Sequence, residues 1–177
     1  MDESISFKTF ERYGLEATSN LLEVRQLAKA VLDVLSTENA SKAIADAHVF
    51  NASSHAIQAV ILDEMMQLGF SSEKKGLFAG YSVSGIRPDY FKPVDGGGVL
   101  FEVERGKTIA NNMDLLDVWK THICTEAKHL FLLVPKVRVQ ASGGKQNIFN
   151  TVSNRLETFF MPNSHPIDVD SVSLFGY

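Results

Sequence analysis

Apolar side chains recur at helical spacing in the first part of the chain. Ser19 or Asn20 could cap a helix whose apolar positions are Leu21, Leu22, Val24, Leu27, Ala28, Val31, Leu32 and Leu35. A second, Ala-rich helix is predicted over residues 40–49. We therefore expect an N-terminal helical region at residues 1–52.

A third helix and two short extended segments are predicted next. Ser53 or Ser54 can cap a helix that runs to the stop signal Gly69. Residues 76–83 (GLFAGYSV) and 85–91 (GIRPDYF) then have the character of short strands. With the strand that follows them, they predict an antiparallel meander.

The centre of the chain predicts a strand, a helix and a second strand. The turn signal PVDGGG at 93–98 precedes the strand VLFEVERG at 99–106. The Asn pair at 111–112 can cap a helix, and Trp119 fits the inner face of that helix as a core residue. The segment HLFLLVP at 129–135 is a continuous apolar run, which is typical of a strand buried on both faces.

The rest of the pattern completes one α/β domain. A helix at about 145–160 and a strand at about 167–175 end the chain. With 177 residues and 45% hydrophobic content, the chain can bury one sizeable core, so we expect a single domain over 1–177. After the helical N-terminal region, it would comprise a core at 53–138 and a C-terminal helix and strand at 139–177. The fold class expected is α/β, with a mixed sheet flanked by helices.

Charge is unevenly distributed in a chain whose net charge is -4. Residues 71–145 hold eleven Lys or Arg against eight Asp or Glu, whereas residues 1–70 hold five against ten and residues 146–177 hold one against three. A basic excess in the middle fits a protein that holds phosphates, but it also fits an ordinary solvated surface. Six side chains have both interpretations: Arg87, Lys92, Arg105, Lys107, Lys136 and Arg138.

Two simple counts narrow the class of protein. The single cysteine, Cys124, excludes an internal disulfide framework and a Cys-rich zinc site, and we expect it to be a small core residue. No uncharged apolar run approaches the length that spans a bilayer, and the acidic start of the chain is unlike a signal peptide. We expect a soluble, cytoplasmic protein that does not contact a membrane.

Three acidic residues in the predicted meander are candidates for one site. Alternation along a strand puts Glu102 and Glu104 on the same side, and a hairpin closed by the glycine-rich turn would bring Asp89 beside Glu102. Like charges so close raise one another's pKa unless a cation neutralises them. Oxygen ligands suit Mg²⁺, which would take Asp89 and Glu102 and the backbone carbonyl of Val103.

The motifs IRPDYF at 86–91 and FEVERGK at 101–107 resemble those of the PD-(D/E)xK nuclease superfamily, the fold of many restriction enzymes, junction resolvases and repair nucleases. The resemblance covers residues 53–135, where the expected order is helix, strand, strand, strand, helix, strand. It implies a restriction-endonuclease-like fold and metal-dependent hydrolysis of DNA by Mg²⁺, with Mn²⁺ as a substitute. A homodimer would supply two sites if both strands are cut.

The resemblance also assigns roles around the acidic cluster. Glu104 stands where the family usually has lysine, and it would serve as base or second-metal ligand. The missing cation would come from Lys120 on the following helix or from Lys107, and we rank Lys120 first. Glu64, with Asp63 as the competing choice, resembles an extra acidic metal ligand that some members carry on the helix before the meander.

Three classes of function follow from this interpretation. The first is a Mg²⁺-dependent DNA endonuclease that acts in restriction or repair. The second is a catalytically inactive nuclease fold that binds nucleic acid or a protein partner, and the absence of lysine at position 104 motivates it. The third, a carboxylate-pair glycosidase, would need an aromatic-lined sugar cleft that the scattered Phe and Tyr residues do not indicate.

Overall fold

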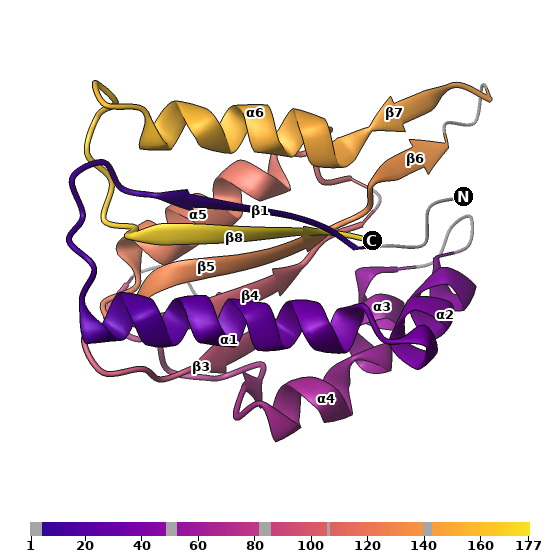
Figure 1. The fold of residues 1–177 in the computed structure, drawn as a ribbon, viewed down its shortest axis with the longest axis horizontal. Helices are drawn as coiled ribbons and strands as arrows, with labels where there is room; N and C mark the ends of the chain where they lie inside the picture. Colours follow the sequence, from indigo (N-terminus) through magenta and orange to yellow (C-terminus); the bar gives the residue numbers. More distant parts are fainter. Residues whose placement is uncertain (1–4, 49–52, 82–85, 106, 140–142) are drawn as a thin grey trace.

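A six-stranded mixed sheet forms the centre of the fold (Figure 1), with the strands in the order β1-β8-β5-β4-β3-β2. The computed structural model describes residues 5–48, 53–81, 86–105, 107–139 and 143–177. The strands of the sheet are β1 (Ser6–Glu11), β2 (Ser71–Ser72), β3 (Tyr90–Lys92), β4 (Gly98–Val103), β5 (Ala127–Val134) and β8 (Ser171–Gly176). A separate two-stranded ribbon consists of β6 (Val137–Val139) and β7 (Lys145–Asn147). The helices are α1 (Ser19–Leu35), α2 (Glu38–Ala47), α3 (Ser54–Val60), α4 (Leu62–Gln67), α5 (Met113–Ile123) and α6 (Ile148–Phe160).

The pairing within the sheet is parallel at its centre and antiparallel at its edges. β5 runs parallel to both β4 and β8, whereas β1 is antiparallel to β8. At the other edge, β3 is antiparallel to both β4 and β2. Parallel neighbours need crossover connections, and here α5 connects β4 to β5. The predicted α/β class, with a mixed sheet flanked by helices, is therefore confirmed.

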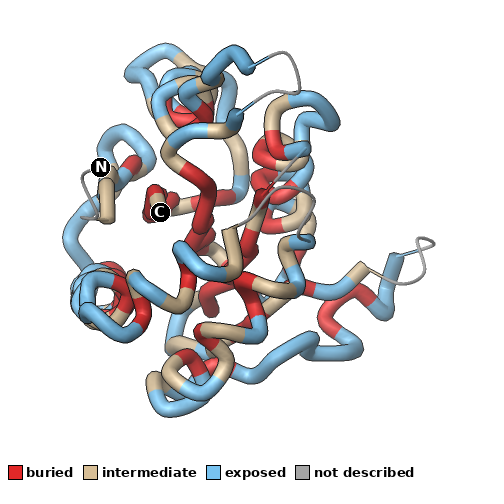
Figure 2. Tube along the Cα trace, turned by 90° about the vertical axis from the view of Figure 1, so that its right-hand side faces the viewer, coloured by how far each residue is buried: buried red, intermediate tan, exposed pale blue. Residues whose placement is uncertain are grey.

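Helices cover both faces of this sheet. On one face, Val118 of α5 and Leu156 of α6 pack in a cluster with Leu100 and Leu132 of the strands. On the other face, α1, α3 and α4 pack around strand residues such as Phe101. Figure 2 shows the buried residues concentrated in the strands and on the helix faces turned towards them. The core is thus built in two apolar layers that share one sheet.

The two central strands follow the predicted pattern. The apolar run of β5 is buried along its length, because α5 and α6 cover one face and α1, α3 and α4 cover the other. In β4, the pleat turns Phe101 and Val103 towards α1 and turns Leu100 towards α5 and α6. Glu102, two residues after Leu100, faces the same side as Leu100. Cys124 is 2% exposed, so its prediction as a core residue is confirmed.

The turn between β3 and β4 depends on glycine. Gly97 has φ +143, and a Cβ atom on it would lie 2.5 Å from the Cγ atom of Lys128. A side chain there is therefore both sterically blocked and conformationally strained. The turn sets the register of the hairpin, in which Tyr90 pairs with Phe101 and Phe91 with Leu100.

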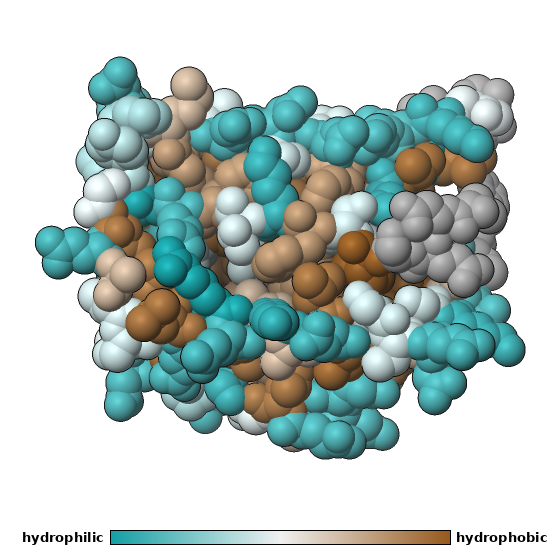
Figure 3. All heavy atoms as spheres, viewed as in Figure 1, coloured by the Kyte–Doolittle hydropathy of each residue, from teal (hydrophilic) through white to brown (hydrophobic). Residues whose placement is uncertain are grey.

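The expectation of a helical region at residues 1–52 is wrong for its first part. β1 pairs along its whole length with β8, and the chain enters α1 only after Thr18, whose side chain accepts the Leu21 N–H in place of the predicted Ser19 or Asn20 caps. Phe7 of β1 is 38% exposed, as expected for an edge strand with one open face. Figure 3 shows apolar residues in the band between the hydrophilic outer surfaces of α1 and α6.

The first extended segment of the predicted meander is also wrong over its described part. Residues 76–81 form turns, and residues 82 and 83 lie outside the described residues. Gly76 has φ +90, and the buried Leu77 and Phe78 pack in the cluster beneath α5 and α6. Their apolar character indicated burial rather than strand pairing. The meander instead begins at β2.

Several element boundaries differ from the prediction. The helix expected to run from Ser53 or Ser54 to Gly69 is divided at Ile61 into α3 and α4. β4 ends at Val103 rather than at residue 106, and the last helix begins at Ile148 because residues 145–147 belong to the ribbon. Asn112 does precede α5, but it has φ 54 and makes no side-chain cap.

The prediction that Trp119 is a core residue is wrong. Trp119 and Leu116 are 44% and 47% exposed, on the outer face of α5. The inner face instead buries Asp114, Asp117 and Thr121 beside Val118. Two large apolar side chains of this helix therefore point to solvent, while three polar side chains lie beside Val118 on the face turned towards the sheet.

Candidate functional site

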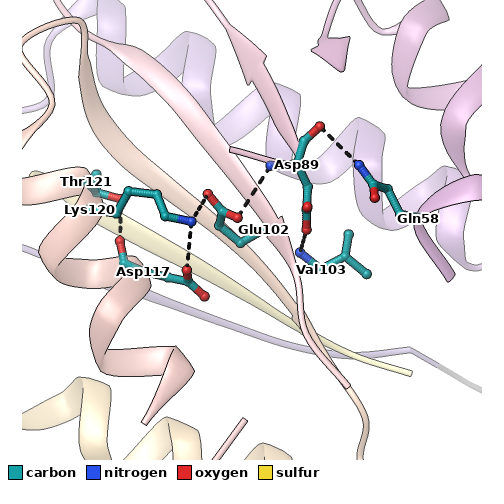
Figure 4. A network of polar contacts seen from close by, with 7 residues as sticks. All are labelled: Gln58, Asp89, Glu102, Val103, Asp117, Lys120 and Thr121. Carbon is teal, nitrogen blue, oxygen red and sulfur yellow. Dashed lines mark hydrogen bonds and ion pairs between the residues drawn. The ribbon is translucent and has the colours of Figure 1, made fainter. Parts of the chain in front are cut away.

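Asp89 and Glu102 lie side by side where β3 begins (Figure 4). The Asp89 N–H donates to Glu102 Oε2 at 3.4 Å, and the Val103 N–H donates to Asp89 Oδ2 at 2.8 Å. The hairpin register accounts for this, because Asp89 and Glu102 come next after the pair Tyr90 and Phe101. The structure therefore places Asp89 beside Glu102 across the hairpin, with each carboxyl group accepting from a backbone N–H of the neighbouring strand. Val103 contacts the pair through its N–H, and its carbonyl remains a predicted metal ligand.

Lys120 reaches the two carboxyl groups from α5. Its Nζ atom lies 2.9 Å from Glu102 Oε1 and 3.2 Å from Asp117 Oδ1. Asp117 and Lys120 are three residues apart, so the helix presents both from adjacent turns. Lys107 is exposed in the turn after β4 and makes no ion pair with these described residues. The geometry thus agrees with the ranking of Lys120 above Lys107.

Asp117 adds a further buried carboxylate to this group. Its side chain is 1% exposed, and its Oδ2 atom has no hydrogen-bond partner among the described residues. Asp89, Glu102, Asp117 and Lys120, together with Glu104 described below, are called the carboxylate cluster here. The cluster holds one ammonium group against four carboxyl groups.

Burial and mutual repulsion perturb every acid in the carboxylate cluster. Burial, followed by the charge of Asp117, raises the pKa of Glu102 well above its ordinary value, against the opposing charge of Lys120. Burial also raises the pKa of Asp89, and it raises the pKa of Asp117 to about 6. Burial alone would lower the pKa of Lys120, but the charges of Glu102 and Asp117 raise it. The Lys120 ammonium group therefore stays charged, and its charge lowers the pKa of both Glu102 and Asp117 against the effect of burial.

Glu104 lies directly after β4 and within electrostatic reach of the other acids. Its N–H donates to the Leu133 carbonyl at 2.8 Å, and its own carbonyl accepts from the Tyr177 hydroxyl at 3.1 Å. The Glu104 side chain is half-buried. Burial, with the charges of Asp117 and Asp89, raises its pKa to about 8. A carboxyl group with this pKa exchanges protons near neutral pH.

The helix before the meander contributes residues other than those predicted. Gln58 Nε2 donates to the Asp89 carbonyl at 3.4 Å, and His55 Nδ1 lies 2.9 Å from Gln58 Oε1. Both come from α3. Glu64 and Asp63 lie on α4 instead, and neither makes a hydrogen bond or ion pair with the described residues of the carboxylate cluster. The structure therefore brings Asp89, Glu102, Glu104 and Lys120 together, but does not join Glu64 to them.

Sequence reasoning missed Asp117 and Gln58. Asp114, Asp117 and Thr121 occur at intervals of three and four, which places them on one helical face. That periodicity was visible in the sequence, but an apolar stripe with Trp119 competed with it. Gln58 has no comparable signal, because its role depends on how α3 crosses the end of β3.

Neither protein-family models nor curated proteins gave a match to this chain. None of the helices in the described ranges combines the length and apolar character needed to cross a membrane. In the same ranges, no three His, Cys, Asp or Glu side chains are already arranged as a metal site. Lys120 lies against Glu102 and Asp117, so the cluster as it stands is organised around an ammonium group.

The carboxylate cluster has three chemical capacities. Adjacent carboxylate oxygens are ligands that suit a hard divalent cation. A buried ammonium group can stabilise negative charge that develops on a substrate. A carboxyl group with a pKa of about 8, that of Glu104, can accept or return a proton.

Proposed function

We propose that this protein is a Mg²⁺-dependent DNA endonuclease of the PD-(D/E)xK type, acting in restriction or repair. One observation carries the proposal: Asp89 and Glu102 are adjacent, and Lys120 is ion-paired to Glu102 at 2.9 Å. The elements around them, α3 and α4, β2, β3, β4, α5 and β5, have the order on which the resemblance rests. Lys120 supports the proposal further, because it supplies from α5 the cation that position 104 lacks.

The donor atoms of the cluster fit Mg²⁺ or Mn²⁺. Asp89 and Glu102 offer hard oxygen ligands, with the Val103 carbonyl as a further candidate. Asp117 Oδ2 is buried without a hydrogen-bond partner in the described residues, and the acids outnumber the nearby cations. A divalent cation would relieve the repulsion that raises their pKa values. When bound, it would polarise the scissile phosphate and orient a water molecule.

The side chains around that position would carry the proton and charge steps. Glu104, when ionised, accepts a proton from the attacking water as the new bond from oxygen to phosphorus forms and the bond to the leaving oxygen breaks. Lys120 donates to a phosphate oxygen as negative charge develops there. Asp117 holds Lys120 through the 3.2 Å contact, so the ammonium group keeps its orientation.

The test is a cleavage assay on plasmid and short duplex DNA with Mg²⁺ or Mn²⁺. The wild-type protein should nick or linearise the DNA, and Asp89→Ala and Glu102→Ala should each reduce the rate by about 10²-fold or more. Asp33→Ala is the matched control, because Asp33 is exposed on α1 and outside the cluster. Equal rates for the wild-type protein and both cluster variants would refute the proposal.

A metal titration separates the enzyme from an inactive nuclease fold. An enzyme should bind Mn²⁺ in calorimetry, and Asp89→Ala should abolish the heat of binding. A protein that binds DNA but neither cleaves it nor binds Mn²⁺ would support the inactive module instead. Sedimentation with duplex DNA would then show whether two copies act together, as a double-strand cut requires.

A further inference from the structure

The β6–β7 ribbon is a local concentration of positive charge in an acidic protein. From Ala127 to Leu156 the sequence holds five Lys or Arg residues and no Asp or Glu, although the whole chain has a net charge of -4. Three of the five belong to the ribbon or precede it directly: Lys136, Arg138 and Lys145. Phosphate-binding surfaces are built from such concentrations.

The register of the ribbon gives it two distinct faces. Arg138 pairs with Gln146, so these two side chains share one face. Val139 pairs with Lys145, and both point to the other face, where Val139 is 56% exposed. Within the described part of the chain, neither Arg138 nor Lys145 has an ion-pair partner. Figure 1 shows the ribbon extending past the end of the main sheet.

Both ends of the ribbon are fixed to the fold. At its start, the Lys136 N–H donates to the Tyr177 carbonyl at 2.6 Å, and the Lys136 carbonyl accepts from the Ile148 N–H at 3.0 Å. At its end, Asn147 caps α6 through a 3.0 Å hydrogen bond from the Asn150 N–H. The ribbon is therefore attached at fixed positions on the fold rather than through a linker.

The ribbon begins at the same edge of the sheet as the carboxylate cluster. β4 and β5 are parallel, so the end of β4, where Glu104 follows, and the end of β5, which leads into β6, lie at one edge. Tyr177 connects the two places, because its hydroxyl donates to the Glu104 carbonyl and its own carbonyl accepts from Lys136. A molecule lying along this edge can reach both.

We propose that the β6–β7 ribbon is an arm that enters a groove of duplex DNA and holds the duplex against the carboxylate cluster; the inference rests on the proposed function. A two-stranded ribbon fits the major groove, which is about 12 Å wide. Arg138 and Lys145 lie on opposite faces of the ribbon, so each can contact phosphates on one wall of the groove, with Gln146 beside Arg138 on its face. The arm makes duplex DNA, rather than a single strand, the favoured substrate.

The experiment measures binding of labelled duplex DNA of about 20 base pairs to the full chain in EDTA, over a series of salt concentrations. Arg138→Ala with Lys145→Ala should weaken binding about tenfold or more and reduce the slope of log affinity against log salt by about 2, because two phosphate contacts are lost. Lys29→Ala with Lys42→Ala is the matched control, since both lysines are exposed on α1 and α2. The control should bind like the wild-type protein, and a single strand of equal length should bind the arm variant and the wild-type protein equally.

The outcomes separate the arm from the catalytic proposal. If the variant with Arg138→Ala and Lys145→Ala binds duplex DNA with the affinity and salt dependence of the wild-type protein, the proposal that the ribbon binds DNA is wrong. The proposal is also wrong if the wild-type protein forms a dimer without DNA and the same variant does not, because the ribbon would then serve self-association. Because binding is measured without a divalent cation, Asp89→Ala should still bind duplex DNA; if it also cleaves normally, the catalytic assignment fails while the arm stands. Should the alanine pair lower the thermal midpoint, Arg138→Gln with Lys145→Gln has the same expected result.

Discussion

Two polar networks are buried at opposite ends of the parallel strands, and they differ in how their charges are balanced. At the end away from the carboxylate cluster, His129 connects β5 to β8 and α1. Its Nδ1 and Nε2 atoms each lie 2.8 Å from a partner, Ser171 Oγ and Asn20 Oδ1. The Asn20 amide in turn donates to the carbonyls of Asp95 at 2.5 Å and Gly97 at 3.4 Å.

The His129 network is neutral and its polar groups have partners. The charges around it are matched, since Arg25 pairs with Glu11 at 2.6 Å and Arg12 with Asp170 at 2.8 Å. The carboxylate cluster instead gathers four acids around Lys120. A satisfied neutral network is explained by folding alone, whereas a surplus of buried like charge is not. This surplus of buried acid makes the carboxylate cluster, and not the His129 network, the candidate functional site.

Removing the cation from the carboxylate cluster should give the largest loss of stability. Lys120→Met leaves Glu102 and Asp117 buried without their partner, which we expect to lower the free energy of unfolding by about 3–5 kcal/mol at pH 8 without metal. Urea denaturation measures this. The loss should shrink at pH 5, because protonated acids no longer need the ammonium group.

The Lys128–Asp168 ion pair provides the control for the Lys120 prediction. These side chains are 27% and 51% exposed, so Lys128→Met should change the free energy of unfolding by about 1 kcal/mol or less. If the two lysine variants lose equal stability, the carboxylate cluster is no more strained than a surface ion pair. The contrast between the two networks would then lose its basis.

The His129 network should weaken in acid. Burial lowers the pKa of His129 to about 4 from an ordinary value of 6.5, so the folded protein binds fewer protons than the unfolded chain between these values. Its contribution is complete above pH 6.5 and falls as the pH drops, by about 3 kcal/mol in total. His129→Gln should flatten this part of the stability curve between pH 7 and pH 4. Parallel curves for the two proteins would show that His129 is not the group responsible.

Glu104 should make the free energy of unfolding fall as the pH rises, which is the opposite of the effect of His129. Its folded pKa of about 8 lies above the ordinary 4.5, so the folded protein binds more protons between these values. Stability without metal is then full below pH 4.5 and falls as the pH rises towards 8. Because the side chain is half-buried, we expect a loss on the order of 2 kcal/mol. Glu104→Gln should remove this slope in EDTA, and Mn²⁺ should reduce it in the wild-type protein; a slope that survives the substitution would assign the loss to another acid.

The central strands were predictable because one physical cause dominates each of them. The run at 129–135 is apolar on both sides because both faces of β5 are covered. The pairing of Asp89 with Glu102 follows from strand alternation and a glycine turn, which are local rules. In β1, by contrast, few residues are buried, and the strand forms only because β8, at the other end of the chain, offers it an edge.

The part of the carboxylate cluster on α5 shows why the rest could not be predicted. The helix was expected to bury the apolar stripe with Trp119, which is the ordinary rule for a helix on a sheet. The sheet beneath it carries Glu102, which attracts Lys120 to the margin of the inner face, and Asp117 at the centre of that face pairs with the same Lys120. The orientation of α5 depends on the charge of Glu102 on β4, and the helical periodicity of α5 alone does not predict it.

Trp119 should give the smallest effect and a reference for Lys120 beside it. Trp119→Ala removes a side chain that is 44% exposed, so we expect the free energy of unfolding to fall by less than about 1 kcal/mol. Val118→Ala, from the inner face of the same helix, should lower it by more, because Val118 is 3% exposed in the core. Urea denaturation of the two variants in parallel measures the difference. A larger loss of unfolding free energy for Trp119→Ala than for Val118→Ala would mean that α5 packs through its Trp119 face. That orientation would turn Lys120 away from Glu102 and Asp117, and the ion pairs would not form.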